Sequence, residues 1–348
     1  MTRVSVCMCV YNGAAYLDSA LASIQRQTLR DWECIVVDDG SSDDTPAILS
    51  RYAAEDSRFQ VYRNERNLGI PRSRNRALEL AQGTYVACMD ADDICCPDRL
   101  ERQVAFMDAN PRLALSSCRY FPFRDGCILP VSGLWRTDLE AVQALLLFFN
   151  PILNPGVIGR RPVLQAFGYD PEYSCTEDLD LWMRMLAQGQ RLAIQPEYLM
   201  LYRLHGKQVT SNTLQGQREQ YRRIIRRFYG QMLFPLSQED VDFLAEGVFF
   251  RTEPDIRRLT SLLGRIHAAN GKTRRFDSDA LRYAMWELLL EYRRAGVSSA
   301  ALAPAMLKLG PVFLAKELYR RRQAGKEDQQ RQSEALKRFS GILGEEKS

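Results

Sequence analysis

In Tyr85-Val86-Ala87-Cys88-Met89-Asp90-Ala91-Asp92-Asp93, five residues with the pattern of a buried strand run directly into three carboxylates. A short apolar run that ends in polar residues predicts one strand of a buried parallel sheet. Crowded carboxylates repel one another unless a cation or hydrogen-bond donors compensate, and a divalent metal ion is the simplest compensation. The stretch therefore predicts both a sheet and a ligand site at the end of one of its strands.

Strand and helix patterns alternate on both sides of this segment. Apolar runs predict further strands at Val4–Val10, Glu33–Val37, Phe59–Tyr62 and Leu113–Cys118. The segments between these strands are predicted to be helices. Leu17, Ala20, Leu21 and Ile24 repeat at helical spacing, and Thr45-Pro46 has the form of an N-cap and first turn. Pro71 and Pro97 each open a further helix, and Gly83 is the expected stop of the helix that Pro71 opens. Alternation of this kind implies an α/β fold, a Rossmann-like and mostly parallel sheet with helices on both faces.

The rest of the chain predicts a smaller helical region. Thr137-Asp138-Leu139-Glu140 has the form of a capping box for a helix through Phe149, and Thr176–Leu186 has a helical apolar face. Strand patterns end near Gly216, and Arg-rich helical segments follow. We therefore expect an α/β domain over residues 1–215 and a helical region over 216–348, with a polar tail that frays after Ala324.

Composition places the chain among ordinary globular proteins. It has 348 residues, 46% hydrophobic and 26% charged, and its nine cysteines contain no C-x-x-C pair. Reduced, mostly buried thiols are therefore expected, and a zinc site is not. The start of the chain runs straight into a predicted strand without the apolar segment of a signal peptide, and no apolar run reaches membrane-spanning length. These features favour a cytoplasmic location.

Charge is distributed unevenly along the chain. Residues 1–215 contain 22 Lys and Arg against 26 Asp and Glu, whereas residues 216–348 contain 25 against 17. The basic C-terminal part indicates either an anionic partner or a solvated helical surface. No DNA- or RNA-binding motif accompanies it, so a nucleic-acid partner is not expected.

Polar residues follow several of the predicted strands. Tyr11 and Asn12 come after the first strand, Asp38 and Asp39 after the second, and the acidic triplet after the fourth. Ligands of open parallel sheets bind at this carboxyl edge. The alternative, that these residues are helix caps and turn formers, accounts for Asp43, Asp44 and Asp98 but poorly for the triplet.

Several longer motifs occur in a fixed order. They are Val4-Ser5-Val6 with Val10-Tyr11-Asn12-Gly13, Gln27-Thr28, Val36-Val37-Asp38-Asp39-Gly40-Ser41, Asp44-Thr45, Asn67-Leu68-Gly69 with Ser73-Arg74-Asn75, Asp90-Ala91-Asp92-Asp93, Thr176-Glu177-Asp178 with Leu181-Trp182, and Tyr202-Arg203-Leu204-His205. In this order they resemble the family-two glycosyltransferases, inverting enzymes with the A-type (GT-A) fold. The resemblance covers residues 3–212, with serine at position 73 where the family has alanine.

The resemblance implies a site for a nucleotide. Asp39 stands where the family accepts the imide N–H of uracil, which favours a UDP-sugar and leaves a dTDP-sugar as the alternative. Tyr11 would stack on the base. Cys9 replaces the small hydroxyl residue often found at its position, which weakens one base contact.

The same resemblance implies a site for the diphosphate and a metal ion. Arg72 and Arg74 follow Pro71 at a helix start, where guanidinium groups and a helix N-terminus both suit a diphosphate. Asp92 would bind Mn²⁺ or Mg²⁺, and Asp90 would face the ribose or the donor sugar and is the second candidate metal ligand. A metal at this place would stabilise the departing nucleoside diphosphate.

Asp178 is the candidate general base, with Glu177 beside it, because the resemblance places them where the family activates the acceptor hydroxyl. Both would also complement the dipole at a helix N-terminus, which is the structural alternative. His205 matches a segment that closes over the donor, and Arg203 and Lys207 could meet the diphosphate there. Trp182 is expected in the core rather than at the acceptor.

Other functions were weighed against this resemblance. A dinucleotide-dependent oxidoreductase needs G-x-G-x-x-G after the first strand, where this chain has Tyr11-Asn12-Gly13-Ala14-Ala15-Tyr16. A nucleotidyltransferase would show a glycine-rich basic loop there. A catalytically silent relative that binds nucleotides or glycans should have lost Asp90, Asp92 or Asp178, and all three are present.

The C-terminal region admits two uses. From Gly310-Pro311 the sequence combines apolar residues with Lys316, Arg320, Arg321 and Arg322. This is either a membrane-surface helix, which would suit a lipid-linked glycan acceptor at the inner face of the cell membrane, or a helix that packs on the catalytic domain or on a second subunit of a homo-oligomer. Synthesis of a surface polysaccharide is the role that the resemblance suggests.

Overall fold

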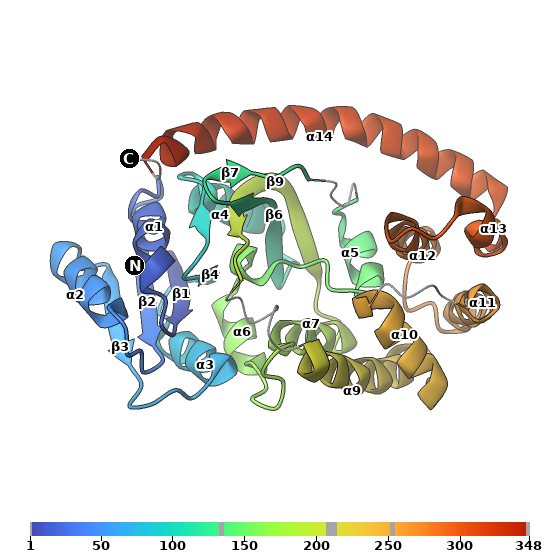
Figure 1. The fold of residues 1–348 in the computed structure, drawn as a ribbon, viewed down its shortest axis with the longest axis horizontal. Helices are drawn as coiled ribbons and strands as arrows, with labels where there is room; N and C mark the ends of the chain where they lie inside the picture. The colour runs from blue at the N-terminus through green and yellow to red at the C-terminus, as the bar shows by residue number, and fades with distance from the viewer. Residues whose placement is uncertain (1, 132–135, 207–213, 251–254, 346–348) are drawn as a thin grey trace.

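The computed structural model describes residues 2–131, 136–206, 214–250 and 255–345. A mixed sheet lies at its centre, helices surround it, and one long helix crosses the whole molecule (Figure 1). The strands follow the order β3-β2-β1-β4-β8-β6-β9-β5, with β7 paired to β6. Their bounds are β1 Val4–Val10, β2 Trp32–Asp38, β3 Phe59–Arg63, β4 Tyr85–Asp90, β5 Ile94–Cys95, β6 Leu115–Arg124, β7 Cys127–Ile128, β8 Ile158–Arg160 and β9 Leu192–Arg203.

The first half of the sheet is parallel, as the sequence predicts. β2 and β4 flank β1, and β3 lies outside β2, all in the same direction. Val10 lies opposite Asp38, and Cys9 lies opposite Asp90. This register brings the ends of three strands, which are far apart in the sequence, to one edge of the sheet.

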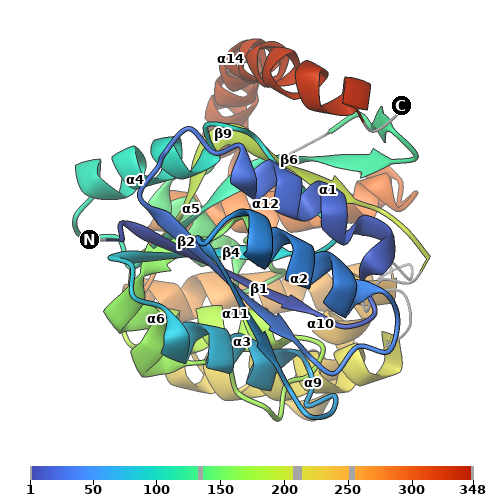
Figure 2. The same cartoon turned by 90° about the vertical axis from the view of Figure 1, so that its left-hand side faces the viewer.

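Helices cover both faces of this half-sheet, which confirms the expected layering. They are α1 Ala14–Gln25, α2 Thr45–Glu55, α3 Ile70–Leu80 and α4 Arg99–Ala109. Alternate residues of β2 point to opposite faces: Ile35 and Val37 join the hydrophobic core on the side of α3, whereas Cys34 and Val36 join the core on the side of α1, α2 and α4. In Figure 2, α1 and α4 lie above the strands, and α3 and α6 lie below them.

Several predicted boundaries are wrong by a few residues. Thr45 is the first helical residue of α2 and Asp44 is its N-cap, and α3 begins at Ile70, one residue before Pro71. α4 begins at Arg99 rather than Pro97, because Ile94–Cys95 form an extra strand. The predicted strand from Leu113 to Cys118 is instead Leu115–Arg124.

Gly83 does not end a helix, because α3 already ends at Leu80. A Cβ atom at Gly83 would lie 2.6 Å from the backbone nitrogen of Ser5. The Gly83 N–H donates to the Ser5 hydroxyl at 2.7 Å. Glycine is therefore needed because the chain passes close to β1 before it enters β4.

The second half of the sheet is built from α5 Leu139–Leu145, the 3-10 turn Asn154–Gly156, α6 Arg161–Phe167 and α7 Glu177–Ala187 around β6, β8 and β9. The expected capping box is wrong: Asp138 is the N-cap of α5 and accepts a hydrogen bond from the Ala141 N–H. α5 also ends at Leu145 rather than Phe149. The helix around Thr176 is confirmed, with Thr176 as N-cap of α7, and Trp182 is fully buried in the core.

Helices alone follow in the described residues after 213, as predicted. They are α9 Leu214–Met232, α10 Gln238–Phe250, α11 Ile256–Thr273, α12 Ser278–Arg294, α13 Ser299–Lys308 and α14 Pro311–Glu345. The hydroxyls of Tyr221 and Tyr229, on α9, donate to the carbonyls of Phe148 and Leu147, each at 2.9 Å. The hydrophobic core of the α3 face continues through α5 and α7 into this helical region. No helix among the described residues is long and apolar enough to cross a membrane.

The expected frayed tail is wrong, because α14 continues through residues 324–345 and returns to the central sheet (Figure 1). Asp328 pairs with Arg119 and accepts a hydrogen bond from the Tyr198 hydroxyl at 3.0 Å. Ala335 and Phe339 are fully buried in the core on the α4 face. The tail has a polar composition because only one narrow stripe of this helix is buried.

Replacing Phe339 by alanine should lower the free energy of unfolding by about 3–5 kcal/mol, because a large buried ring is removed and leaves a cavity. Urea denaturation measures this loss. Leu336, on the same helix, is 42% exposed, and Leu336→Ala is the matched control. The control should change the stability by no more than about 0.5 kcal/mol. A Phe339→Ala effect as small as that of the control would contradict the docking of α14.

Candidate active site

Most of the residues predicted from the sequence converge at the carboxyl edge of β1, β2 and β4. The loops after these strands carry Tyr11, Asp39 and the acidic triplet. The start of α7 adds Glu177 and Asp178, and the end of β9 adds Arg203 and His205. Arg72 is exposed and contacts none of these residues. Lys207 lies outside the described residues.

The Asp39 carboxylate holds the loop before α3. It is 4% exposed and accepts hydrogen bonds from the Asn64 side chain at 2.7 Å, from the Leu68 N–H at 2.8 Å and from the Gly69 N–H at 2.9 Å. A carboxylate has about four acceptor positions. One of them, on Oδ2, is therefore unused by these bonds. The backbone bonds explain why an acidic residue at position 39 is needed even without a ligand.

The first two loops are joined beside Asp39. The Asn12 N–H donates to Ser41 Oγ at 2.9 Å, and Asn12 Oδ1 accepts from the Ser42 N–H at 2.9 Å. Gly40 has φ +79°, and a Cβ there would lie 2.8 Å from the backbone of Arg66. Tyr11 is left 52% exposed at the mouth of the site, which makes its ring available for stacking.

Cys9 lies below this mouth, in β1. Burial raises the pKa of its thiol far above the ordinary value, although the Arg74 charge opposes the shift. The thiol is therefore neutral at physiological pH, and it is a weak hydrogen-bond donor compared with a hydroxyl. The weakened contact of Cys9 with a base stays a prediction.

The three carboxylates of the acidic triplet have different surroundings. Asp93 is fully buried, and its Oδ1 accepts from the Arg203 N–H at 2.9 Å. Its Oδ2 is buried and has no hydrogen-bond partner. Burial, with the charges of Asp92 and Asp90, raises the pKa of Asp93 well above its usual range. Burial and Asp92 also raise the pKa of Asp90, although Arg74 opposes this. The triplet is thus a site of unbalanced negative charge that favours a cation.

His205 lies against Asp92 at the centre of the site. Its Nε2 is 2.9 Å from Asp92 Oδ2, and its ring contacts Tyr16 with centroids 4.7 Å apart. Arg203 also points inward, because its Nε donates to the Asp92 carbonyl at 2.7 Å and its guanidinium lies over the Tyr16 ring at 4.8 Å. The end of β9 therefore holds Asp92 from two sides.

Asp92 and His205 are the side chains that could hold a metal ion at this site. Among the described residues, no three His, Cys, Asp or Glu side chains are grouped as a complete metal site. Mg²⁺ and similar ions at phosphate sites commonly use only one or two carboxylates, with substrate phosphates and water as the other ligands. An oxygen and a nitrogen ligand beside an excess of negative charge fit such a partial site.

Arg74 connects the acidic triplet to α7. Its guanidinium donates to Asp90 Oδ1 at 3.0 Å and to Glu177 Oε1, and it lies over the Tyr169 ring at 5.5 Å from the centroid. Burial alone would lower its pKa, but Asp90 and Glu177 raise that pKa well above the usual value. Asn75 holds the Tyr169 backbone by accepting from its N–H at 2.7 Å and donating to its carbonyl at 2.8 Å, and the Tyr169 hydroxyl donates to Asn154 Oδ1 at 3.1 Å.

Glu177 and Asp178 form the first turn of α7. Burial raises the pKa of Glu177 to about 7, while Arg74 opposes the shift. Burial also raises the pKa of Asp178, against the opposing charge of Arg74. Asp178 Oδ2 accepts a hydrogen bond from Asn150 Nδ2 at 2.8 Å, and its Oδ1 accepts from the Leu179 N–H at 2.7 Å.

Asn150 is a site residue that the sequence analysis missed. Its Oδ1 accepts from the Ile152 N–H at 3.1 Å, which leaves its amide nitrogen to face Asp178. The only local signal is the Asn150-Pro151 dipeptide, which is typical of a turn. Such a signal indicates loop structure and carries no information about a partner 28 positions away. Tyr169 and Asn64 were missed for the same reason.

Comparisons with known proteins identify the family of this chain. The sequence profile of Glycosyl transferase family 2 matches residues 5–135. The putative teichuronic acid biosynthesis glycosyltransferase TuaG of Bacillus subtilis is 34% identical over 218 residues, which cover 60% of this chain and 82% of that protein. The Escherichia coli UDP-Glc:alpha-D-GlcNAc-diphosphoundecaprenol beta-1,3-glucosyltransferase WfaP is 27% identical over 212 residues, which cover 61% of this chain and 81% of the other. The chain belongs to glycosyl transferase family 2.

The fold of this glycosyltransferase is also found in a solved relative. The crystal structure of S. aureus TarS 1-349 in complex with UDP-GlcNAc superposes with a TM-score of 0.57 at 20% identity, over 84% of this chain and 90% of that chain. This likeness concerns the fold, and it confirms the expected GT-A architecture. Family membership makes the chain an enzyme with a nucleotide-sugar donor, which removes the oxidoreductase and nucleotidyltransferase alternatives.

Replacing Asp39 by asparagine should lower the free energy of unfolding by about 1–3 kcal/mol in the absence of any nucleotide. The amide nitrogen cannot accept a hydrogen bond, so one of the three donors that face Asp39 loses its acceptor. Chemical denaturation gives the measurement. Asp44→Asn is the control, since the Asp44 side chain makes no capping hydrogen bond. An Asp39→Asn protein as stable as the control would show that the loop before α3 does not depend on this carboxylate.

Proposed function

We propose that this glycosyltransferase moves a sugar from a UDP-sugar to a hydroxyl of a glycan or lipid-linked acceptor, in the synthesis of a surface polysaccharide. A dTDP-sugar is the alternative donor. The role in polysaccharide synthesis is supported by the names of TuaG and WfaP, and a lipid-linked acceptor is supported by the diphosphoundecaprenol in the name of WfaP. The observation that carries the chemistry is the pairing of Arg74 with Asp90 of the acidic triplet and with Glu177, the residue next to Asp178 at the start of α7.

The base would bind between the first two strand loops. Tyr11 would stack on it, and the unused acceptor position of Asp39 Oδ2 would face an imide N–H. A carboxylate acceptor favours uracil or thymine, because adenine offers no imide N–H at that edge. The Leu68 side chain, which is 37% exposed, would add to the apolar surface that the Tyr11 ring offers to the base.

Asp92 and His205 would hold a divalent cation, Mn²⁺ or Mg²⁺, with Asp90 close to the ribose or donor sugar. When bound, such an ion neutralises charge that develops on the departing diphosphate. Arg74 donates one N–H to each of two carboxylates, which fixes the position of its guanidinium between Asp90 and Glu177. Because a guanidinium has five N–H donors, Arg74 could position these two carboxylates and also donate to the diphosphate.

Asp178 would act as the general base. The acceptor oxygen attacks the anomeric carbon, its proton passes to the Asp178 carboxylate, and the bond to the diphosphate breaks. Inversion at that carbon follows from the family. Burial raises the pKa of Asp178 toward neutral pH, which strengthens it as a base while it remains ionised. The Asn150 amide supports the ionised form and fixes the orientation of the carboxylate.

Calorimetric titration with UDP, with and without Mn²⁺, tests the donor site. Binding should depend on the metal and should weaken by about 100-fold or more in Asp92→Asn, because a metal ligand contributes more than the outer partners whose loss costs about 10–100-fold. Asp44→Asn should bind as the unchanged protein does. If UDP, dTDP and GDP all fail to bind under every condition, the catalytically silent alternative replaces this proposal.

Asn150→Ala should move the acidic limb of the kcat/KM profile for UDP-sugar hydrolysis to higher pH. Asn150 donates to the charged form of Asp178 and so lowers its pKa, and its removal lets that pKa rise. Gln143→Ala, which removes an amide that donates to the Gln190 carbonyl rather than to Asp178, should leave the profile unchanged. Asp178→Asn should reduce kcat by about 10²–10⁴-fold with UDP binding retained. Full activity of Asp178→Asn would refute the assigned base.

A further inference from the structure

Large exposed apolar side chains are concentrated at the junction of α13 and α14. Leu307 is 70% exposed, Val312 68%, Leu318 56% and Tyr319 66%. Among the described residues, the other exposed large apolar side chains are less exposed: Tyr11 at 52% and Leu68 at 37% lie at the proposed donor site, and Leu336 at 42% lies farther along α14. Exposure of four such side chains within one short segment marks an interaction surface.

These side chains do not form the packing face of α14. Phe313 and Glu317, which are 4% and 1% exposed, lie on the opposite face of the same helix. Phe313 packs near Arg282 of α12, with the guanidinium 5.9 Å from the ring centroid. The helix is thus held to the protein by one face, and Val312 and Tyr319 project from the other.

Basic side chains surround the exposed apolar residues. Lys308, Lys316 and Arg322 are exposed, and no ion pair to them occurs among the described residues. The only acidic residue between 305 and 326 is Glu317, which is buried and pairs with Arg320 at 3.3 Å. We call Leu307, Lys308, Val312, Lys316, Leu318, Tyr319 and Arg322 the α13–α14 surface; it is both apolar and cationic.

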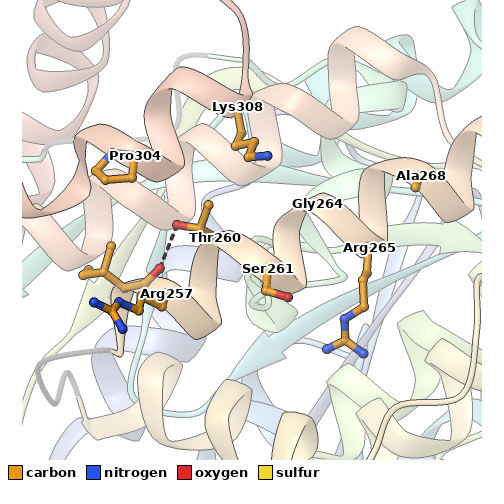
Figure 3. A pocket seen from close by; sticks show the side chains of 9 residues that line it. Arg257, Thr260, Ser261, Gly264, Arg265, Ala268, Pro304 and Lys308 are labelled. Carbon is orange, nitrogen blue, oxygen red and sulfur yellow. Dashed lines mark hydrogen bonds between the residues drawn. The ribbon is translucent and has the colours of Figure 1, made fainter.

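A groove of about 660 Å³ between α11 and α13 adjoins this surface at Lys308. Arg257, Thr260 and Ser261 line its α11 side, and Pro304 and Lys308 line its α13 side (Figure 3). Arg257 is exposed, and its guanidinium has no ion-pair partner among the described residues. The Thr260 hydroxyl already donates to the Ile256 carbonyl at 2.7 Å. The two cations and the Ser261 hydroxyl suit an anionic phosphate headgroup.

We propose that the α13–α14 surface docks on an anionic phospholipid membrane. Tyrosine and aliphatic side chains suit the headgroup boundary, lysine and arginine can bury their stems there while their charges stay in water, and each cation is attracted to anionic lipid. A second copy of the chain fits less well. A two-fold pairing of this surface with itself would place like charges opposite one another.

α14 connects the docked surface rigidly to the catalytic sheet. Its far end is fixed by the Arg119–Asp328 pair and by buried Phe339. Docking would therefore orient the catalytic unit at the membrane, where a lipid-linked acceptor would lie. The docking itself does not rest on the proposed chemistry, and an Asp178→Asn protein is expected to bind membranes as well as the unchanged chain.

Cosedimentation with phosphatidylcholine vesicles, with and without phosphatidylglycerol, tests the inference. The full chain should bind the vesicles that contain phosphatidylglycerol, and rising salt should weaken the binding. Lys316→Gln combined with Tyr319→Ser should reduce the binding about tenfold or more, since one cation alone is worth about fivefold. Lys337→Gln combined with Leu336→Ser makes matched changes at the other end of α14 and should bind normally.

Both double variants change exposed positions, and equal urea midpoints would show that their folding is intact. Absence of binding by the unchanged chain, or equal binding by the two variants, would overturn the proposal. So would a concentration-dependent dimer, detected by light scattering, that is lost only in the Lys316→Gln and Tyr319→Ser variant. Loss of UDP binding with vesicle binding retained would contradict the proposed donor site and leave this inference standing.

Discussion

The partly buried pairing of Arg74 with Asp90 and Glu177 is the interaction on which the site depends. Three elements meet there: α3 carries the arginine, β4 ends in one carboxylate and α7 begins with the other. A buried charge without partners is costly, so each member requires the others. The guanidinium also lies over the Tyr169 ring, and Asn75 holds the Tyr169 backbone. The arrangement joins the half of the site proposed for the nucleotide to the half proposed for the acceptor.

The parallel register of β1, β2 and β4 makes this pairing geometrically possible. Because Val10 lies opposite Asp38 and Cys9 lies opposite Asp90, loops that are tens of residues apart begin at the same level of the sheet. Most of the hydrogen-bond acceptor positions of Asp39 are occupied by donors that hold the loop before α3. The same carboxylate can thus shape the site and present its remaining acceptor position to a ligand.

The helical region contributes position rather than catalytic groups. Its core is continuous with that of the α/β domain, and α14 returns along the sheet to end beside α4. One face of α14 is buried against the protein, and its first turns expose apolar and basic side chains on the other. A helix with two such faces can hold a catalytic unit against a surface without any membrane-spanning segment.

The sequence by itself determined the α/β class, the strands that end in polar residues and the family, because apolar periodicity and contiguous motifs are local properties. It also indicated Asp90, Asp92, Glu177 and Asp178, since each lies within such a motif. Only the tertiary structure decided the Asn150–Asp178 bond, the donors to Asp39 and the docking of Phe339. Each of these contacts joins residues that lie far apart in the chain. Such contacts depend on how whole elements pack, and neither the spacing of apolar residues nor turn chemistry encodes that packing.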